Sequence, residues 1–373
     1  MQFIFQNAVI PLKKLQLKEI NDAATRLYFK LHDISFESLN ISDYNNRYFG
    51  DHLKELRQSL QLYSYILAWS IAEMNLPITK CTILDYGGGC GLLSLFAKEL
   101  NFKTVLYNDI YEISCQDAKT IGLCTGNQAD HYIVGDIDDA VNFFKQNDIR
   151  CNSIVSYDVI EHIYDMEYFI KKLPELTDKT CSTIVMSSGA NSCNPFIVRR
   201  LKKQHYKVEF EDKEDYAGRK KRDALESYFT IRKNIIQQHA PDLNSYEINE
   251  ITRKTRGLIE RDIINVIDDY KITKKLPRAP VHPTNTCDPY TGNWAEHLMD
   301  INQLKDQLND VGFRSKIIAG YFGNSDKGGN IRNRVIVPGF NTLINSPKFG
   351  ICLAPFFTLY GTTCGENVHT VQQ

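Results

Sequence analysis

The chain lacks the patterns that mark several common classes of protein. Its 44 basic and 45 acidic side chains leave no positive excess, which argues against a general nucleic-acid binder. Its ten cysteines form no C-x-x-C pair and no cluster with histidine at metal-ligand spacing, so we expect reduced thiols, a cytoplasmic location and no metal site. No apolar run reaches the about 18 residues of a membrane-spanning helix, and residues 1–15 lack the layout of a secretory signal. What is present is a chain of 373 residues, 43% of them hydrophobic, which is long enough to bury a large core.

One glycine-rich stretch organises the rest of the chain. Residues 81–91 run Cys-Thr-Ile-Leu-Asp-Tyr-Gly-Gly-Gly-Cys-Gly. The apolar run 82–84 predicts a buried parallel strand, and 92–100 carries apolar residues at helical spacing. A strand, a glycine turn and a helix form the first unit of a doubly wound sheet. The glycines let a ligand lie against bare backbone, because a β-carbon would occupy its place.

The spacing of these glycines indicates which ligand the turn would hold. The dinucleotide fingerprint G-x-G-x-x-G fails because its third glycine falls on Leu92 or Ser94, and no Lys of a phosphate loop follows. What stands is an acidic residue followed by alternating glycines: Asp85, Gly87, Gly89 and Gly91. Here the chain resembles the class I S-adenosylmethionine-dependent methyltransferases, whose first motif has this form. A tight turn without a ligand is the alternative, but four glycines in five positions cost more chain entropy than a turn requires.

The resemblance implies further donor-binding residues at the ends of the next two strands. The strand 104–107 leads to Asp109, where the family places the carboxylate that accepts hydrogen bonds from the ribose of the donor. A solvated aspartate is the alternative. The strand 131–134 leads to Asp136 and Ile137, which match the residues that contact the adenine in similar enzymes. The next residues, 138–139, are also acidic and compete for the role of Asp136.

A fourth strand is predicted over 153–157, and the motif after it resembles that of small-molecule methyltransferases. Ligands of doubly wound sheets bind at the carboxyl ends of the strands, so Tyr157 and Asp158 are expected beside the methyl donor. His162 follows at the start of the next helix and is a candidate general base, because an imidazole titrates near neutral pH. A histidine that only bonds to backbone at the helix start is an equally good interpretation.

After a fifth strand over 182–188 the regular alternation breaks. Residues 189–297 are too long for a strand connection and contain helical stretches, so we expect a helical insertion. The insertion ends in a proline-rich loop, 279–297, which we interpret as an acceptor-binding lid with His282 and Asp288 as acid or base candidates. His297 is a further candidate there. A structural loop held by its prolines is the alternative.

The fold class expected from this series is α/β, with a doubly wound, mostly parallel, seven-stranded sheet. A sixth strand is predicted over 315–319, and a final antiparallel strand over 334–337. Within the N-terminal region we expect residues 45–48 to form a loop rather than a lid over the site. The parts are a helical cap (1–79), a Rossmann-like core that binds S-adenosylmethionine (80–188), the insertion and lid (189–297), the last helix and strands of the core (298–338) and an apolar tail (339–373). The tail is expected to pack on the protein, with a dimer contact or a weak membrane contact as alternatives.

The sequence therefore predicts an enzyme that moves a methyl group from S-adenosylmethionine to an O or N atom of a small-molecule or glycan acceptor. Two other functions stay open on the same fold. One is an aminopropyl-type transferase, which uses a different part of the donor. The other is a non-catalytic scaffold or sensor that binds S-adenosylmethionine. The residues leave the acceptor and the oligomeric state open.

Overall fold

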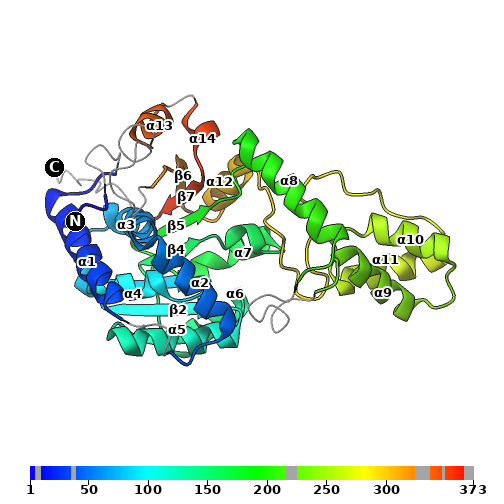
Figure 1. Cartoon of the computed structure of the whole chain (residues 1–373), viewed down its shortest axis with the longest axis horizontal. Helices are drawn as coiled ribbons and strands as arrows, with labels where there is room; N and C mark the ends of the chain where they lie inside the picture. The colour runs from blue at the N-terminus through cyan, green and yellow to red at the C-terminus, as the bar shows by residue number, and fades with distance from the viewer. Residues whose placement is uncertain (5–9, 35–38, 215–224, 324–336, 347–348, 365–373) are drawn as a thin grey trace, which may run out of the picture. The chain divides into compact units, whose positions relative to one another are not determined.

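A computed structural model describes the chain apart from residues 5–9, 35–38, 215–224, 324–336, 347–348 and 365–373. Its centre is a seven-stranded sheet in the order β3-β2-β1-β4-β5-β7-β6 (Figure 1). All strands run parallel except β7, which is antiparallel to both of its neighbours. The predicted doubly wound fold is therefore confirmed. The strands are β1 (Thr82–Tyr86), β2 (Thr104–Asp109), β3 (His131–Val134), β4 (Ser153–Tyr157), β5 (Thr183–Ser188), β6 (Arg314–Ala319) and β7 (Phe357–Thr362).

Helices precede the sheet, alternate with its strands and fill the connection from β5 to β6. Three of them come before β1: α1 (Lys14–His32), α2 (Asp43–Lys54) and α3 (Leu56–Ala72). Four follow β1 to β4 in turn: α4 (Leu92–Glu99), α5 (Glu112–Thr125), α6 (Ile137–Gln146) and α7 (Met166–Lys172). The helices between β5 and β6 are α8 (Pro195–Phe210), α9 (Tyr228–His239), α10 (Ser245–Lys254), α11 (Glu260–Thr273) and α12 (Ile301–Asp310). Two lie between β6 and β7, α13 (Val337–Ile344) and α14 (Gly350–Leu353).

The chain divides into two compact units. The first unit, Met1–Val159, Glu167–Ser188 and Ile301–Gln373, contains the whole sheet. The second unit, Ile160–Met166 and Gly189–Asp300, contains α8 to α11. The second unit has a core of its own, formed by buried isoleucines of α9, α10 and α11: Ile231, Ile235, Ile236, Ile251, Ile263 and Ile267. Nowhere in the described ranges is a helix both long and apolar enough to cross a membrane.

The core of the first unit lies on the face of the sheet that α1, α3 and α4 cover. Alternate residues of a strand point to opposite faces, so register partners share a face. The partners Val155 and Val185 pack in this core, and Tyr360 of β7 continues the row. Ile154 and Ile184, one residue earlier in each strand, are buried on the other face. Two buried faces explain why the central strands read as nearly continuous apolar runs.

One row of register partners crosses the carboxyl ends of β4 and β5. Tyr157 pairs with Ser187, Ser187 with Thr358, and Thr358 with Ile318. Because partners share a face, these four side chains point to the face that carries α3. Tyr157 and Ile318 accordingly pack against the core of that face.

The predicted final strand is wrong. Val337 begins helix α13, and residues 334–336 lie outside the described residues. The strand that pairs with both β5 and β6 is β7, which belongs to the segment 339–373 that we expected as a separate tail. β7 lies inside the sheet, between β5 and β6, and its side chains on both faces are buried. Phe357 and Leu359 are among them.

The prediction that all cysteines are reduced is also wrong, because Cys181 and Cys364 form a disulfide. The antiparallel pairing of β5 and β7 explains this bond. Thr183 pairs with Thr362, so each cysteine lies two residues beyond the last pair and opposite the other cysteine. Disulfides are rare in the cytosol, so the cysteines no longer support the expected cytoplasmic location.

Candidate functional site

The turn between β1 and α4 holds its glycines in the left-handed region of backbone space. Gly87, Gly89 and Gly91 have φ values of +70°, +54° and +80°. Residues with a β-carbon rarely adopt this conformation, which explains the alternating glycines. The hydroxyl of Tyr107 on β2 donates a hydrogen bond to the carbonyl of Gly89 at 2.6 Å and fixes the centre of the turn.

The glycines of the turn serve two different purposes. A β-carbon on Gly87 would lie 2.6 Å from Val159, so packing as well as its left-handed backbone requires this glycine. A β-carbon on Gly89 would meet one neighbour, the Cε1 atom of Tyr48, at 3.3 Å. Gly89 therefore has no β-carbon where Tyr48 packs over the turn, and a side chain there would push against this ring.

Asp109 ends β2 beside this glycine. Its Oδ2 accepts the amide of Gly89 at 3.0 Å, and its Oδ1 accepts the amide of Tyr111 at 2.9 Å. The side chain is almost buried, with 6% of the residue surface exposed. The predicted ribose-binding carboxylate and the predicted glycine turn are thus in direct contact. The same carboxylate also holds the turn in place.

Asp85, the acidic residue of the motif, lies beneath the turn. It is buried, and the hydroxyl of Ser94 on α4 donates to its Oδ2 at 2.7 Å. Burial raises the pKa of Asp85 to about 7, although the bond from Ser94 lowers it. A β-carbon on Gly88 would lie 2.9 Å from Oδ2, so the carboxylate supports the turn from below.

The residues predicted to contact adenine begin helix α6. Asp136 is exposed and caps the helix: its Oδ1 accepts the amides of Asp138 at 2.9 Å and Asp139 at 3.3 Å. Ile137 is buried in the first turn. The neighbouring acid Asp139 reaches back to the amide of Asp136 at 3.1 Å, which completes a capping box. Asp139 thus points back to the helix start, while Asp138 accepts the hydroxyl of Tyr168 at 2.8 Å.

Tyr157 and Asp158 leave β4 toward the same edge of the sheet. Asp158 has a φ of +52°, and its amide donates to the carbonyl of Ser187 on β5 at 2.9 Å. A left-handed aspartate is uncommon and occurs where the chain turns sharply. The ring of Tyr157 contacts that of Tyr63 on α3 edge to face, with centroids 6.0 Å apart.

Helix α2 covers the glycine turn, so the prediction of a loop over residues 45–48 is wrong. Tyr48 lies on this helix above Gly89. Burial raises the pKa of Tyr48 well above its usual value, and Cys90 and Asp158 add to the shift. The sequence carried a signal for this helix, because serine is a preferred residue at the start of a helix. In the structure the Ser42 side chain caps α2 by accepting the amide of Asn45.

A buried carboxylate on α5 holds α2 in place. Asp117 accepts hydrogen bonds from the Ser42 hydroxyl at 2.5 Å and from the Asn45 amide group at 2.7 Å. The backbone amide of Ser42 also donates to it, at 3.1 Å. Three hydrogen bonds to one carboxylate orient the start of α2 and, through it, Tyr48.

Aromatic rings connect this cover with the end of β4. Tyr48 contacts His52 with ring centroids 4.9 Å apart, and His52 lies 6.1 Å from Tyr63, which contacts Tyr157. Burial lowers the pKa of His52 to about 4, so this imidazole is neutral at neutral pH. Ring faces attract cations, and a sulfonium is a cation.

The three residues predicted to be catalytic all belong to the second unit. His162 lies in a short 3₁₀ turn, and its Nδ1 is 2.7 Å from the carbonyl of Trp294. A carbonyl only accepts, so Nδ1 donates its proton and the neutral ring carries its lone pair on Nε2. This tautomer suits a base, while the same bond also fits the structural interpretation of His162.

The lid residues separate into a histidine cluster and a turn. The rings of His282 and His297 have centroids 4.5 Å apart, and the ring of His297 is 4.7 Å from that of Trp294. Burial lowers the pKa of His282 to about 4, and the charge of the neighbouring His297 adds to this shift. Asp288 is buried in a turn, where its Oδ1 accepts the amides of the residues two and three positions on, at 2.8 and 3.2 Å. Asp288 thus has a structural role of its own, away from the solvent.

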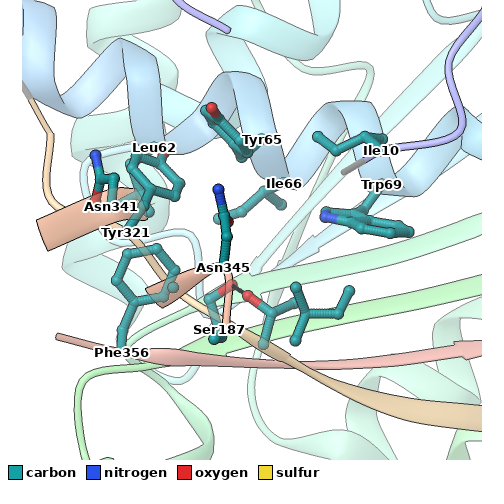
Figure 2. Close-up of a pocket in the computed structure, with 14 residues that line it drawn as sticks. Ile10, Leu62, Tyr65, Ile66, Trp69, Ser187, Tyr321, Asn341, Asn345 and Phe356 are labelled. Carbon is teal, nitrogen blue, oxygen red and sulfur yellow. Dashed lines mark hydrogen bonds between the residues drawn. The ribbon is translucent and has the colours of Figure 1, made fainter. Parts of the chain in front are cut away.

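A pocket in the first unit lies on the α3 face of the sheet, and sequence reasoning missed it. Its fourteen lining residues come from α3, from β5, β6 and β7 and the residues next to β6 and β7, from α13 and the residue after it, and from Ile10 before α1 (Figure 2). It encloses about 100 Å³. Ser187 and Thr358 form its floor, with their hydroxyls 2.7 Å apart. No sequence signal marked it, because its walls meet only through the register of β5, β6 and β7.

In the described ranges, no group of three or more His, Cys, Asp or Glu side chains could hold a metal ion.

No known protein family model matches the chain, and no curated protein matches it.

The solved structures to which this chain is similar include methyltransferases. The CurJ carbon methyltransferase aligns with 94% of this chain and 67% of its own, at 11% identity and a TM-score of 0.40. An S-adenosylmethionine-dependent methyltransferase from Mesorhizobium loti aligns with 77% of this chain and 93% of its own, at 12% identity and a TM-score of 0.36. Magnesium protoporphyrin IX methyltransferase from Synechocystis, with bound S-adenosylhomocysteine, shares 22% identity over 36% of this chain and 58% of its own, at a TM-score of 0.28. This chain thus spans less than two thirds of the Synechocystis enzyme, and the reaction has to be inferred from the site.

Proposed function

We propose that the chain is an S-adenosylmethionine-dependent methyltransferase that acts on an O or N atom of a small-molecule or glycan acceptor. The observation that carries this proposal is the contact between Asp109 and the central glycine of the turn, Gly89. A carboxylate at the end of β2 and bare backbone at the end of β1 meet at the edge where doubly wound sheets bind nucleosides.

The residues of the site fit a cationic nucleoside. Gly89 carries no side chain, Asp109 can accept hydrogen bonds from a ribose, and Asp136 is exposed at the adjacent strand end. The acids at this edge, with the ring of Tyr48 above Gly89, favour positive charge. When bound, the donor supplies a methyl group on a sulfonium sulfur that becomes neutral as the methyl leaves. The protein mainly holds the reactants in line and excludes water.

Whether the reaction needs a base depends on whether the acceptor atom must lose a proton. A hydroxyl acceptor loses a proton, whereas a neutral amine can react before it does so. Between the predicted bases, His162 is the better candidate, because its bond to Trp294 leaves Nε2 as the basic nitrogen. His282, with a pKa near 4, is a weak base at neutral pH. Asp288 is occupied as a turn former.

The lining of the pocket favours methyl transfer over aminopropyl transfer. A polyamine acceptor carries several positive charges and requires carboxylates around it. None of the fourteen lining residues is Asp or Glu. The observation favours an uncharged acceptor.

The proposal is tested with the purified full-length chain, S-adenosylmethionine labelled on its methyl group, and a small-molecule extract. We expect one labelled methyl group to appear on an extract component, detected by mass spectrometry, together with S-adenosylhomocysteine. A gain of an aminopropyl group would identify the other transferase. Donor binding by calorimetry without any product would identify a scaffold or sensor, and absence of donor binding would overturn the proposal entirely.

A further inference from the structure

The pocket under α3 differs from the rest of the site because its lining, in the part of the chain that the structure describes, carries no charged side chain. Its fourteen lining residues include no Asp, Glu, Lys, Arg or His. Lys316 lies over the ring of Trp69, with Nζ 4.5 Å from the centroid, and is 3.8 Å from the carboxylate of Glu73. Because an ion loses its hydration on entering such a pocket and finds no partner there, charged ligands are disfavoured.

The walls of the pocket are aromatic and flat. Tyr65 of α3 and Tyr321, which follows β6, have ring centroids 4.0 Å apart, and Phe356 meets Tyr321 edge to face at 5.4 Å. Such rings pack best against other planar rings. Figure 2 shows these side chains together with those of Leu62 and Ile66 around the space above the sheet.

Besides the Tyr and Trp groups of the walls, the pocket has polar side chains at its floor and its mouth. The hydroxyls of Ser187 and Thr358 share one hydrogen bond, which uses one of their two protons and leaves the other to donate elsewhere. Asn345, just after α13, is exposed and lines the pocket, and Figure 2 shows it between the side chains of α3 and Ser187. Asn341 is used differently, since its amide exchanges two hydrogen bonds with the backbone of Phe322 at 2.8 and 3.0 Å.

The floor of this pocket adjoins the carboxyl end of β4, where the predicted donor-binding residues Tyr157 and Asp158 lie. Ser187 is the register partner of Tyr157, and its carbonyl accepts the amide of Asp158. Neighbouring strands lie about 4.8 Å apart. A molecule above Ser187 therefore lies one strand away from the predicted donor-binding residues of β4. Tyr321, Asn341, Asn345 and Phe356, from the part of the chain between β6 and β7, line the pocket opposite α3.

We propose that this pocket binds the methyl acceptor, and that the acceptor is an uncharged, planar ring compound with at least one hydrogen-bonding group. This inference rests on the proposed function and narrows its acceptor class. It places the ring against the aromatic cluster of Tyr65, Tyr321 and Phe356, a polar substituent at the hydroxyls of Ser187 and Thr358, and the mouth at Asn345. A glycan has many hydroxyl groups and no planar ring, so its shape and polarity match this aromatic lining poorly.

Three probes of nearly equal size separate charge from shape: p-cresol is neutral, 4-hydroxybenzoate is an anion and tyramine is a cation. We titrate each, and glucose, into the full-length protein saturated with S-adenosylhomocysteine. We expect p-cresol to bind at least about tenfold more tightly than the two ions and glucose, since the ions lose hydration without a partner. Equal or tighter binding of an ion or of glucose would overturn the inference.

Two tryptophan variants then locate the binding. Asn345→Trp fills the mouth of the pocket, whereas Leu343→Trp adds the same side chain at an exposed position of α13 that does not line it. We expect p-cresol to bind at least about tenfold more weakly to the first variant only, because its bulk occupies the ligand space. Unchanged binding in Asn345→Trp would overturn the assignment.

Binding of S-adenosylhomocysteine is measured in parallel for the wild type and both variants. Retained affinity shows that each variant is folded. Failure of p-cresol selectivity with intact S-adenosylhomocysteine binding would refute the pocket assignment alone. Failure of S-adenosylhomocysteine to bind the wild type would instead refute the proposed function, and the acceptor assignment with it.

Discussion

The ring of Tyr48 lies over Gly89, with its Cε1 atom 3.3 Å from the point that a β-carbon on Gly89 would occupy. The two residues come from different parts of the chain, a helix of the N-terminal cap and the turn after β1. This ring atom is the only neighbour within 4 Å of that point among the described residues, so Tyr48 packs closely against the centre of the turn. The amide of Gly89 is held by Asp109.

We predict that Gly89→Ala weakens binding of S-adenosylhomocysteine by at least about tenfold, because the new methyl group presses on Tyr48 at the turn proposed to hold the donor and the left-handed backbone disfavours alanine. The affinity is measured by calorimetry. Gly126→Ala is the matched control, since Gly126 has a φ of +69° but no atoms within 4 Å of a new β-carbon. Both variants should lose about 1–2 kcal/mol of stability, and equal affinities in the two would exclude Gly89 from the donor site.

Asp109 gives a second test of the donor site. Asp109→Ala should weaken S-adenosylhomocysteine binding by about 1.5–3 kcal/mol, the range for hydrogen bonds to a charged group. Asp130→Ala serves as the control. Asp130 also accepts a backbone amide, that of Val105 at 2.7 Å, and pairs with Lys98, but it precedes β3 and so lies away from the carboxyl ends of the strands. Calorimetry that finds the same loss in both variants would assign the effect to folding rather than to ribose binding.

The sequence was sufficient for features that depend on local pattern. The glycine turn, the strand ends at Asp109 and Tyr157 and the helical insertion all follow from short motifs and their order. The final strand did not, because residues 334–337 and 357–362 are both short apolar runs. Which of them joins the sheet is decided by pairing with β5 and β6, far away in the chain.

The disulfide and the pocket depend on that same pairing. Cys181 and Cys364 are 183 residues apart in the sequence and become neighbours only once β7 lies beside β5. Ser187 and Thr358 meet for the same reason. Residue spacing carries no information about such contacts, so neither feature could be predicted before the strand order was known.

The buried carboxylate beneath the turn makes stability depend on pH. Burial raises the pKa of Asp85 from 3.8 to about 7, so the folded protein holds this proton more tightly than the unfolded chain. The stabilisation is therefore complete below about pH 4 and is lost as the pH rises toward about 7. Asp85→Asn should remove this loss, so that its advantage over the wild type grows by at least about 1 kcal/mol between about pH 5 and about pH 8.

Urea unfolding at the two pH values measures this difference. Ser94→Ala is a useful companion variant, because it removes the hydrogen bond that lowers the pKa of Asp85. The loss of stability should then extend to higher pH than in the wild type. If the wild type and Asp85→Asn change in parallel with pH, Asp85 does not hold the proton that burial predicts.

The disulfide provides a final test of the corrected sheet. It closes a loop with a sequence separation of 183 residues and joins β5 to β7 beyond their last paired residues. Reduction with dithiothreitol should lower the free energy of unfolding by about 2–4 kcal/mol, since the unfolded chain regains the freedom of this loop. Cys364→Ser should show the lower stability from the outset and no response to the reductant. Cys124→Ser, which changes an exposed free thiol, should behave as the wild type does. A wild type whose melting temperature ignores the reductant would contradict the bond, whereas a response confined to chains with both Cys181 and Cys364 would support the placement of β7 beside β5.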